Sequence, residues 1–244
     1  LMAYDKSQIK ELLTNYGKID IFFFDGPEEG LKQYAWELQP DLVVTRGQMQ
    51  TPEQKLPDKP IPGPWEACFT MGTDWQYKPT NDPHKSGTEI INMLIETRAK
   101  GGNLLLNIGP KPNGEIQIEQ EALLREIALW NLVNQEGIHD IRPWEIIKER
   151  NIWFTKSKNG NTVYAFIPSG DEWKYAERKE FVFTTLSGSD KTKISILGYA
   201  SELVEYRPGY DSKIYFSQTP IGLVISAVNG HRLYTNNKWP NPVV

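Results

Sequence analysis

Residues 19–26, with the sequence IDIFFFDG, constrain the fold of this chain more than any other stretch. A short, uninterrupted run of bulky apolar residues is typical of a strand covered on both faces, as in parallel sheets. The run ends in Asp25 and Gly26. Since ligand sites and catalytic groups gather at the carboxyl ends of parallel strands, Asp25 is the first candidate functional residue. Alternatively, Asp25 caps a helix that begins after Pro27, and the residues alone leave both interpretations open.

Apolar runs and helical patterns alternate through the rest of the first half. Further strands are predicted at about 42–45, 66–71 and 103–108, and helices at about 9–16, 28–38, 90–100 and 123–136. Such alternation indicates a parallel sheet or a (β/α) barrel. A barrel needs eight strands, and this half supplies four. We therefore expect either a small open sheet or the C-terminal part of a larger barrel.

The pattern changes near residue 143. Short strand candidates separated by Gly, Asn, Asp and Ser turns follow at about 152–155, 162–167, 181–184, 193–197, 203–206, 213–216 and 222–226. Regularly spaced short strands of this kind predict an antiparallel β-sandwich of about seven strands. We therefore divide the chain into an α/β domain at 1–142 and a β-sandwich domain at 143–244.

Composition and motifs exclude several classes of function. The net charge of −4, without a run of Lys and Arg, argues against a nucleic-acid partner, and no apolar stretch is long enough to span a membrane. Cys68 is the single cysteine, which we interpret as a core residue. The three histidines have no partner at metal-ligand spacing, and no nucleotide-binding glycine motif occurs. We therefore predict neither a metal nor a cofactor.

Charged residues collect around the predicted strand ends. Asp25 and Arg46 follow two of the strands, Glu66 begins the third, and Glu53 lies in a proline-rich loop between them. Glycoside hydrolysis requires two carboxyl groups, one to donate a proton and one to attack or to activate water. Asp25 at a strand tip suits a nucleophile, and Glu53 on a loop suits a proton donor. Arg46 could hold Asp25 ionised or bind a substrate hydroxyl.

Five segments, taken in order, resemble the retaining α-L-fucosidases of glycoside hydrolase family 29. They are IDIFFFDG, VVTRG with TPEQ, PWEACFTMGTDWQY, ETRAKGGNLLLNIGPKPNGEI and GIHDIRPW. The resemblance covers about residues 4–145 and is most specific in the FDG strand and the KGGNLLLNIGP run. The family's fold leads us to expect the second half of a (β/α)8-like barrel followed by an antiparallel β-sandwich.

The resemblance also implies roles for single residues. Asp25 matches the nucleophile that forms a covalent fucosyl-enzyme, and Arg46 a contact to the sugar or the nucleophile. Trp75 matches part of the apolar wall beneath the fucose methyl group, and Phe23 stands where family members often carry tryptophan in the nucleophile strand.

The acid/base varies in position within the family. Glu53 is our first choice and Glu66 the second. Glu66 begins a strand and should point away from the catalytic mouth, so a structural role is the alternative for it.

The family's barrel normally begins well upstream, with histidines and a tryptophan that bind fucose and have no counterpart here. We therefore expect an N-terminal half, from the same or a separate chain, to complete the barrel, because an isolated half would expose sheet edges and apolar surface. The expected function is retaining hydrolysis of α-linked L-fucose from fucosylated glycans. The alternatives are a non-catalytic carbohydrate-binding or interaction protein of the same fold and, more weakly, a hydrolase for another sugar. The resemblance favours a periplasmic or secreted location.

Overall fold

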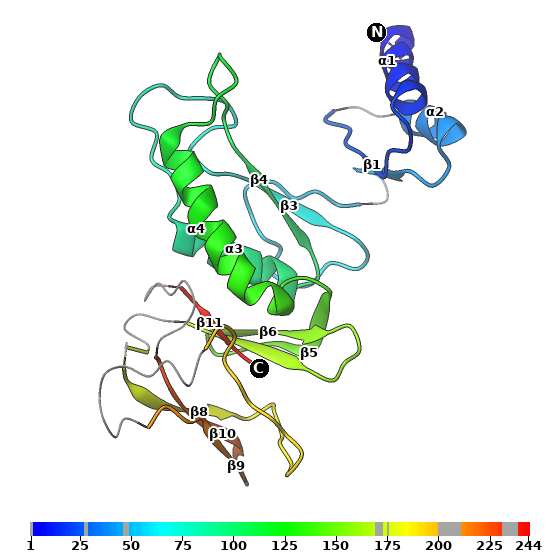
Figure 1. Ribbon diagram of the computed structural model, residues 1–244. Coiled ribbons are helices and arrows are strands. Elements are labelled where there is room, and N and C mark those ends of the chain that lie inside the picture. The colour runs from blue at the N-terminus through cyan, green and yellow to red at the C-terminus, as the bar shows by residue number, and fades with distance from the viewer. Residues whose placement is uncertain are drawn as a thin grey trace.

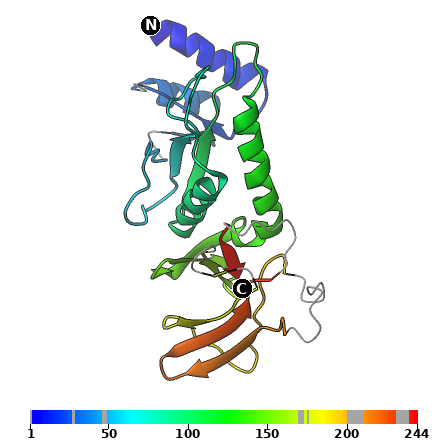
Figure 2. The same cartoon turned by 90° about the vertical axis from the view of Figure 1, so that its left-hand side faces the viewer.

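A computed structural model describes residues 2–26, 29–45, 49–168, 173–174, 176–199, 211–230 and 239–244. An α/β part comes first and an antiparallel β part follows it (Figure 1). Seen after a quarter turn, the α/β part stands on the β part, with α4 reaching down to it (Figure 2). Within the described ranges, no helix is long and apolar enough to cross a membrane.

The N-terminal layer consists of two short parallel strands and two helices. These are α1 (Met2–Asn15), β1 (Ile21–Phe22), α2 (Leu31–Leu38) and β2 (Val43–Val44). Apolar residues of all four elements form one buried cluster. On α1, Ile9 and Leu13 enter this cluster, whereas Leu12 and Tyr16 are exposed. The layer therefore has a core of its own on the helix side of the strands.

A second parallel pair follows, with its helices on one face. It comprises β3 (Glu66–Thr70), α3 (Gly87–Ala99), β4 (Asn103–Asn107) and α4 (Ile118–Asn134). Glu66 lies opposite Asn103 and Thr70 opposite Asn107, so both carboxyl ends meet at one edge. A capping box starts α3, where the Ser86 hydroxyl accepts from the Glu89 amide and the Glu89 carboxylate accepts from the Ser86 amide.

Two of the parallel strands, β1 and β4, are covered on one face only, whereas residues 67–70 of β3 are buried on both faces. Successive side chains of a strand point to opposite faces, and Phe24 is buried beneath the helices while Ile21 is 53% exposed and Phe23 40% exposed. On β4, Leu105 is 39% exposed. The prediction of a strand buried on both faces is therefore wrong for β1 and also does not describe β4, because no described element covers the second face of these two strands.

The antiparallel part begins after a short 3-10 helix at Gln135–Gly137. Its strands are β5 (Ile141–Glu149), β6 (Ile152–Ser157), β7 (Val163–Ile167), β8 (Arg178–Phe183), β9 (Tyr215–Thr219), β10 (Gly222–Val228) and β11 (Asn241–Val243). They form one sheet in the order β11-β7-β6-β5 and another in the order β8-β10-β9. Phe154 of the first sheet and Phe183 of the second meet edge to face at 6.0 Å within a shared core. The two sheets thus bury their apolar faces against each other.

Several strand predictions need correction. Residues 193–197 form no strand, although Ser195 exchanges backbone hydrogen bonds with Val244. The candidate at 203–206 lies outside the described residues. β5 and β11 were not predicted, since Pro143 and Pro242 lie inside them and both strands are at an edge of their sheet.

The two parts share an apolar contact. Side chains of α3 and α4 pack with side chains of β5 and β7 in one buried cluster around Trp130. The Trp130 indole nitrogen donates to the Pro240 carbonyl at 3.1 Å, and the Trp239 indole nitrogen donates to the Glu126 carboxylate at 2.8 Å. The β part therefore supports the helices that back β3 and β4.

Candidate active site

The carboxyl ends of the parallel strands surround a pocket of about 530 Å³ on the uncovered face. Its walls include Phe23, Asp25, Glu53 and Trp75, with Cys68 and residues 105–108 beneath. Four of the six predicted site residues are thus brought together, from segments far apart in the sequence. Arg46 lies outside the described residues, and Glu66 is not part of the pocket wall.

Asp25 follows β1 and faces this pocket. Ladder bonds run from the Val43 amide to the Asp20 carbonyl and from the Thr45 amide to the Phe22 carbonyl. The Phe24 amide then donates to the Thr45 hydroxyl at 2.9 Å, which ends the regular pairing one residue before Asp25. The cap of α2 is Gly30, in the left-handed region at φ 75°. The alternative role of Asp25 as the cap of this helix is therefore excluded.

Glu53 is held beside the middle of β3. The Cys68 amide donates to the Pro52 carbonyl at 2.9 Å, and the Gln54 amide donates to the Cys68 carbonyl at 2.8 Å. These bonds pair Glu53 with Cys68 in a parallel bridge. The proline-rich loop thus adds a short extended segment to the sheet, and this segment places Glu53 in the pocket wall.

Lys100 fixes the rest of that loop. Its ammonium group is 4% exposed, pairs with Glu96 of the same helix and donates to the Pro57 carbonyl at 2.7 Å. It also lies 5.2 Å from the ring centroid of Trp153 on β6. One buried cation therefore links the loop that carries Glu53, the helix α3 and the β part.

Cys68 lines the same pocket as the two candidate carboxylates. Burial raises the pKa of its thiol, and the negative charges of Glu53, Glu66 and Asp25 raise it further. A thiol with a raised pKa is protonated and weakly nucleophilic. The interpretation of Cys68 as a core residue is confirmed by its burial, and its surroundings show that three carboxyl groups act on one point of the site.

Glu66 starts β3, at the end of the strand opposite the pocket mouth. It pairs with Asn103 in the ladder and is half buried, and burial raises the pKa of its carboxyl. It shares a strand face with Cys68, two residues further on. Glu66 thus lies below the pocket, whereas Glu53 lies in its wall.

Trp75 stands on the loop between β3 and α3. Its backbone amide donates to the Asp74 carboxylate at 2.8 Å, and its indole is 40% exposed. The loop packs closely on Gly109, since a Cβ there would come within 2.8 Å of the Gln76 backbone. Because Gly109 has no side chain, the loop can pack directly against it, and this contact sets the position of the Trp75 indole.

Two residues of β4 belong to the site although the sequence did not single them out. Leu105 and Asn107 line the pocket. Asn103, at the other end of the strand, accepts a hydrogen bond from the Arg98 guanidinium at 2.8 Å. The NLLLN stretch places its first, third and fifth residues on one strand face, and this alternation was the available signal.

The site consists of carboxyl, aromatic and amide groups. Across the described part of the chain, no group of three or more His, Cys, Asp and Glu side chains could hold a metal ion. Asp25 and Glu53 place two carboxyl groups in the wall of one pocket, from segments that are distant in the sequence.

Comparison with known proteins shows which family this chain is similar to. The model of the family described as "Alpha-L-fucosidase" matches residues 3–136. An α-L-fucosidase of Dictyostelium discoideum is 32% identical over 142 residues, which are 57% of this chain and 30% of that protein. The chain thus spans about a third of the length of such curated relatives.

Two solved structures share the fold. α-L-Fucosidase isoenzyme 1 from Paenibacillus thiaminolyticus has a TM-score of 0.77 at 25% identity, over 99% of this chain and 61% of that one. A Bacteroides thetaiotaomicron α-L-fucosidase, trapped as a covalent intermediate with 2-fluoro-fucosyl fluoride, has a TM-score of 0.72 at 20% identity, over 99% and 60%.

Proposed function

We propose a function for this chain on the basis that it belongs to the α-L-fucosidase family. In this proposal, the residues before β5 are the second half of a (β/α)8-like barrel and the residues from β5 onward an antiparallel β-sandwich; the boundary expected between 142 and 143 moves to the start of β5, because Ile141 and Arg142 already pair with β6. The parallel pairs β1–β2 and β3–β4, with helices on one side, support the barrel half. The two antiparallel sheets around one core support the sandwich.

The uncovered strand face is the interior of that barrel. Ile21, Phe23 and Leu105 are apolar and at least 39% exposed there, beside the pocket. An N-terminal half, on the same or a separate chain, would bury these side chains and close both sheet edges. The chain covers 61% of the Paenibacillus structure, which leaves room for such a half.

The proposed reaction is retaining hydrolysis of terminal α-linked L-fucose from a glycan. An Asp25 carboxylate oxygen attacks the anomeric carbon of fucose, the bond from that carbon to the glycosidic oxygen breaks, and Glu53 gives its proton to the departing oxygen. Water then attacks the same carbon, Glu53 takes a proton from it, and the bond to Asp25 breaks. The trapped covalent intermediate of the Bacteroides enzyme supports the two-step course.

The observation that carries this proposal is that Asp25 and Glu53 line one pocket. Glu53 is preferred as acid/base because it reaches the pocket, whereas Glu66 lies below it. The raised pKa of Glu66 suits a proton donor, so Glu66 stays the second candidate. Two carboxyl groups supply both the nucleophile and the proton, and no step of this mechanism requires a metal or an organic cofactor.

Trp75 and Phe23 complete the proposed fucose site. Both are 40% exposed in the pocket wall, and such apolar faces suit the methyl group and the ring hydrogens of a deoxy sugar. Arg46 is proposed as a contact to the sugar or to Asp25, since it follows β2 as Asp25 follows β1.

The test is turnover of an aryl fucoside by the complete enzyme, with the N-terminal half supplied. Asp25→Asn is expected to abolish turnover and to leave the thermal unfolding midpoint close to that of the wild type. Asp20→Asn, which changes an exposed carboxylate paired with Lys18 in the same segment, is the matched control and should retain full activity. Substantial turnover by Asp25→Asn would refute the nucleophile assignment.

The one-sided strands also favour a second candidate function. A barrel half with an open interior could serve as a non-catalytic carbohydrate-binding or interaction protein. Hydrolysis of the aryl fucoside by the chain alone, and again with the N-terminal half added, separates the two. No turnover in either case, with fucose binding retained, would support the binding protein.

A further inference from the structure

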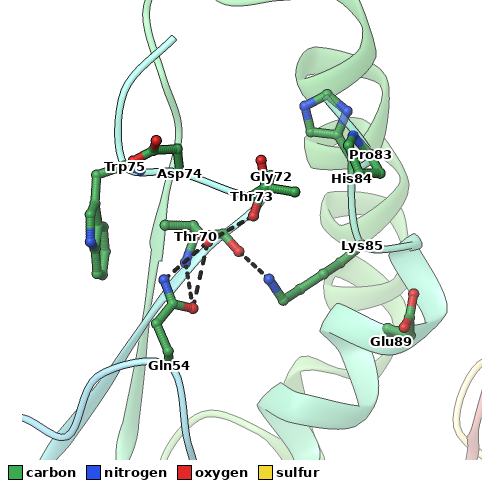
Figure 3. A pocket seen from close by; sticks show the side chains of 10 residues that line it. All are labelled: Gln54, Thr70, Gly72, Thr73, Asp74, Trp75, Pro83, His84, Lys85 and Glu89. Carbon is green, nitrogen blue, oxygen red and sulfur yellow. Dashed lines mark hydrogen bonds between the residues drawn. The ribbon is translucent and has the colours of Figure 1, made fainter. Parts of the chain in front are cut away.

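The loop from Met71 to Lys85, between β3 and α3, carries Trp75 into the wall of the candidate active site. Figure 3 shows a pocket of about 630 Å³ that this loop borders, with Trp75 on one side and His84 and Lys85 on the other. The Lys85 amide donates to the Met71 carbonyl at 3.0 Å, which closes the base of the loop. The position of Trp75 therefore depends on what holds the residues in between.

Asp82 joins the two arms of the loop. Its carboxylate accepts from the Thr73 amide at 3.0 Å and from the Thr73 hydroxyl at 2.6 Å, and its side chain is 3% exposed. The hydrogen bonds from Thr73 lower the pKa of this carboxyl against the effect of burial, and the positive charges of His84, when protonated, and Lys78 lower it further. Asp82 therefore stays ionised at neutral and mildly acidic pH.

Two buried amides at the start of α4 fix the loop from the other side. The Gln117 side-chain amide donates to the Lys78 carbonyl at 3.1 Å. The Gln120 side-chain amide lies between the Gly109 backbone amide and the imidazole of His84, at 3.1 Å from each. Gln117 is 6% exposed and Gln120 is 3% exposed, so water competes little for these hydrogen bonds.

The direction of the hydrogen bonds of Gln120 determines the protonation state of His84. A backbone amide can only donate, so Gln120 turns its Oε1 toward Gly109 and its Nε2 toward the ring. That Nε2 group can also only donate, so Nε2 of His84 must be the unprotonated acceptor. The imidazole is therefore neutral in this arrangement, with its proton on Nδ1.

Protonation of His84 removes this contact. A proton on Nε2 would face the amide protons of Gln120, whereas the Asp82 carboxylate lies 3.8 Å from the same nitrogen and attracts the charged ring. From α4, the group in contact with the ring is the uncharged Gln120. Among the described residues, the other charged groups that share the pocket of His84 or act on Asp82 are Asp74, Lys78, Lys85 and Glu89.

We infer that Gln120 and His84 are positioning residues for the candidate active site: neutral His84 ties the Trp75 loop to α4, and protonated His84 turns to Asp82 and releases the loop. Neither residue lines the pocket of Asp25, so both act through Trp75. The inference rests on the proposed function only where it concerns substrate. If Trp75 forms part of the fucose site, release of the loop weakens binding and raises KM more than it lowers kcat.

The first measurement reads the imidazole directly and does not depend on activity. Nitrogen NMR of the complete enzyme with isotope-labelled histidine shows which ring nitrogen carries the proton, and the signals missing from His84→Gln identify His84. The neutral form should carry its proton on Nδ1. A neutral form with the proton on Nε2 would overturn the inference, whether or not the enzyme hydrolyses fucosides.

The second measurement is KM for an aryl fucoside between about pH 5 and about pH 8, the range in which histidines ordinarily titrate. His84→Gln keeps an acceptor for Gln120 but gains no charge. Gln120→Glu places a carboxylate where it accepts from both Gly109 and protonated His84. Near the acidic limit, the KM of each variant should be about two- to tenfold lower than that of wild type, and near the alkaline limit the KM of His84→Gln should equal it. The ratio to wild type removes the titration of the catalytic carboxyls, which all these proteins share.

The matched control is His139→Gln, an exposed histidine outside both pockets, and its KM should equal that of wild type at every pH. A KM ratio that does not change with pH in His84→Gln and in Gln120→Glu would overturn the inference and leave the proposed function intact. Absence of aryl fucoside hydrolysis by wild type would overturn the proposed function, and the tautomer of His84 would still decide whether the tether exists.

Discussion

The link between Lys100 and the loop of Glu53 makes a quantitative prediction. We expect Lys100→Met to loosen the segment 50–57 while the fold of the remainder stays intact. Methionine preserves the apolar stem of lysine, so the packing around residue 100 changes little. What is lost is the ammonium group, which is almost fully buried.

The size of the effect follows from the contacts of the ammonium group. Glu96 lies on the same helix, so that ion pair does not hold the loop. The bond to the Pro57 carbonyl, at 2.7 Å, does join the two segments. A hydrogen bond from a charged donor contributes about 1.5–3 kcal/mol, which corresponds to an increase of roughly 10- to 100-fold in local opening.

Amide hydrogen exchange of the complete enzyme, read by mass spectrometry, measures this opening. The Gln54 amide is bonded to the Cys68 carbonyl and the Gln50 amide to the Pro64 carbonyl, so both report on the segment. Their protection factors should fall by the stated amount in Lys100→Met. In Lys111→Met, which breaks a partly exposed pair with Glu115, they should stay unchanged.

Two results would refute the reasoning. Protection of segment 50–57 within twofold of the wild type would show that Lys100 does not hold the loop. An equal loss of protection over the whole chain would show that Lys100 acts on global stability alone. If the predicted local loss occurs, the aryl fucoside kcat should fall with it, because Glu53 loses its fixed position.

Three further predictions concern the site. Glu53→Gln should lower kcat for a fucosyl disaccharide by about 10²- to 10⁴-fold, and should lower kcat less for an aryl fucoside with a good leaving group. Glu66→Gln should have a smaller effect on the disaccharide kcat, and a larger effect than that of Glu53→Gln would move the acid/base role to Glu66. Burial raises the pKa of Glu66, so the folded state binds its proton more tightly than the unfolded state does. Glu66 therefore lowers the stability of wild type as pH rises above the ordinary glutamate pKa, and the unfolding midpoint of Glu66→Gln relative to wild type should increase between about pH 4 and about pH 7. A difference that stays constant over this range would contradict the prediction. Gly109→Ala should push the Gln76 backbone and the Trp75 loop outward and lower kcat/KM for aryl fucoside, and unchanged kinetics with unchanged tryptophan fluorescence would show that the loop adapts at no cost.

Local signals in the sequence were sufficient for the helices and strands of the α/β part, but not for every strand of the β part. The apolar runs at 66–71 and 103–108 became β3 and β4, and the helical stripe that follows each of them became α3 and α4. Strands and helices of this kind depend on the period of side chains along one segment, which can be read without knowing the fold. Edge strands were missed, because Pro143 in β5 and Pro242 in β11 break the expected pattern where the sheet does not need their amides.

The candidate site required more than local signals. Asp25 stood out at the end of an apolar run, but its alternative role as a helix cap ended only when Gly30 was seen at the start of α2. The preference for Glu53 over Glu66 as the acid/base depends on where each residue lies along β3. Glu66 is at the start of the strand, whereas the pairing of Glu53 with Cys68 places Glu53 in the pocket wall.

The sequence by itself determined the order of elements, the carboxylate at the tip of the first strand and the likeness to a family, because these depend on neighbours along the chain. Tertiary structure alone decided that β1 and β4 each leave one face uncovered, that a buried lysine ties the loop to the helices, and that Glu53 reaches the pocket wall. Each of these depends on contacts between residues distant in sequence, such as Lys100 with Pro57, whose partners no local pattern specifies.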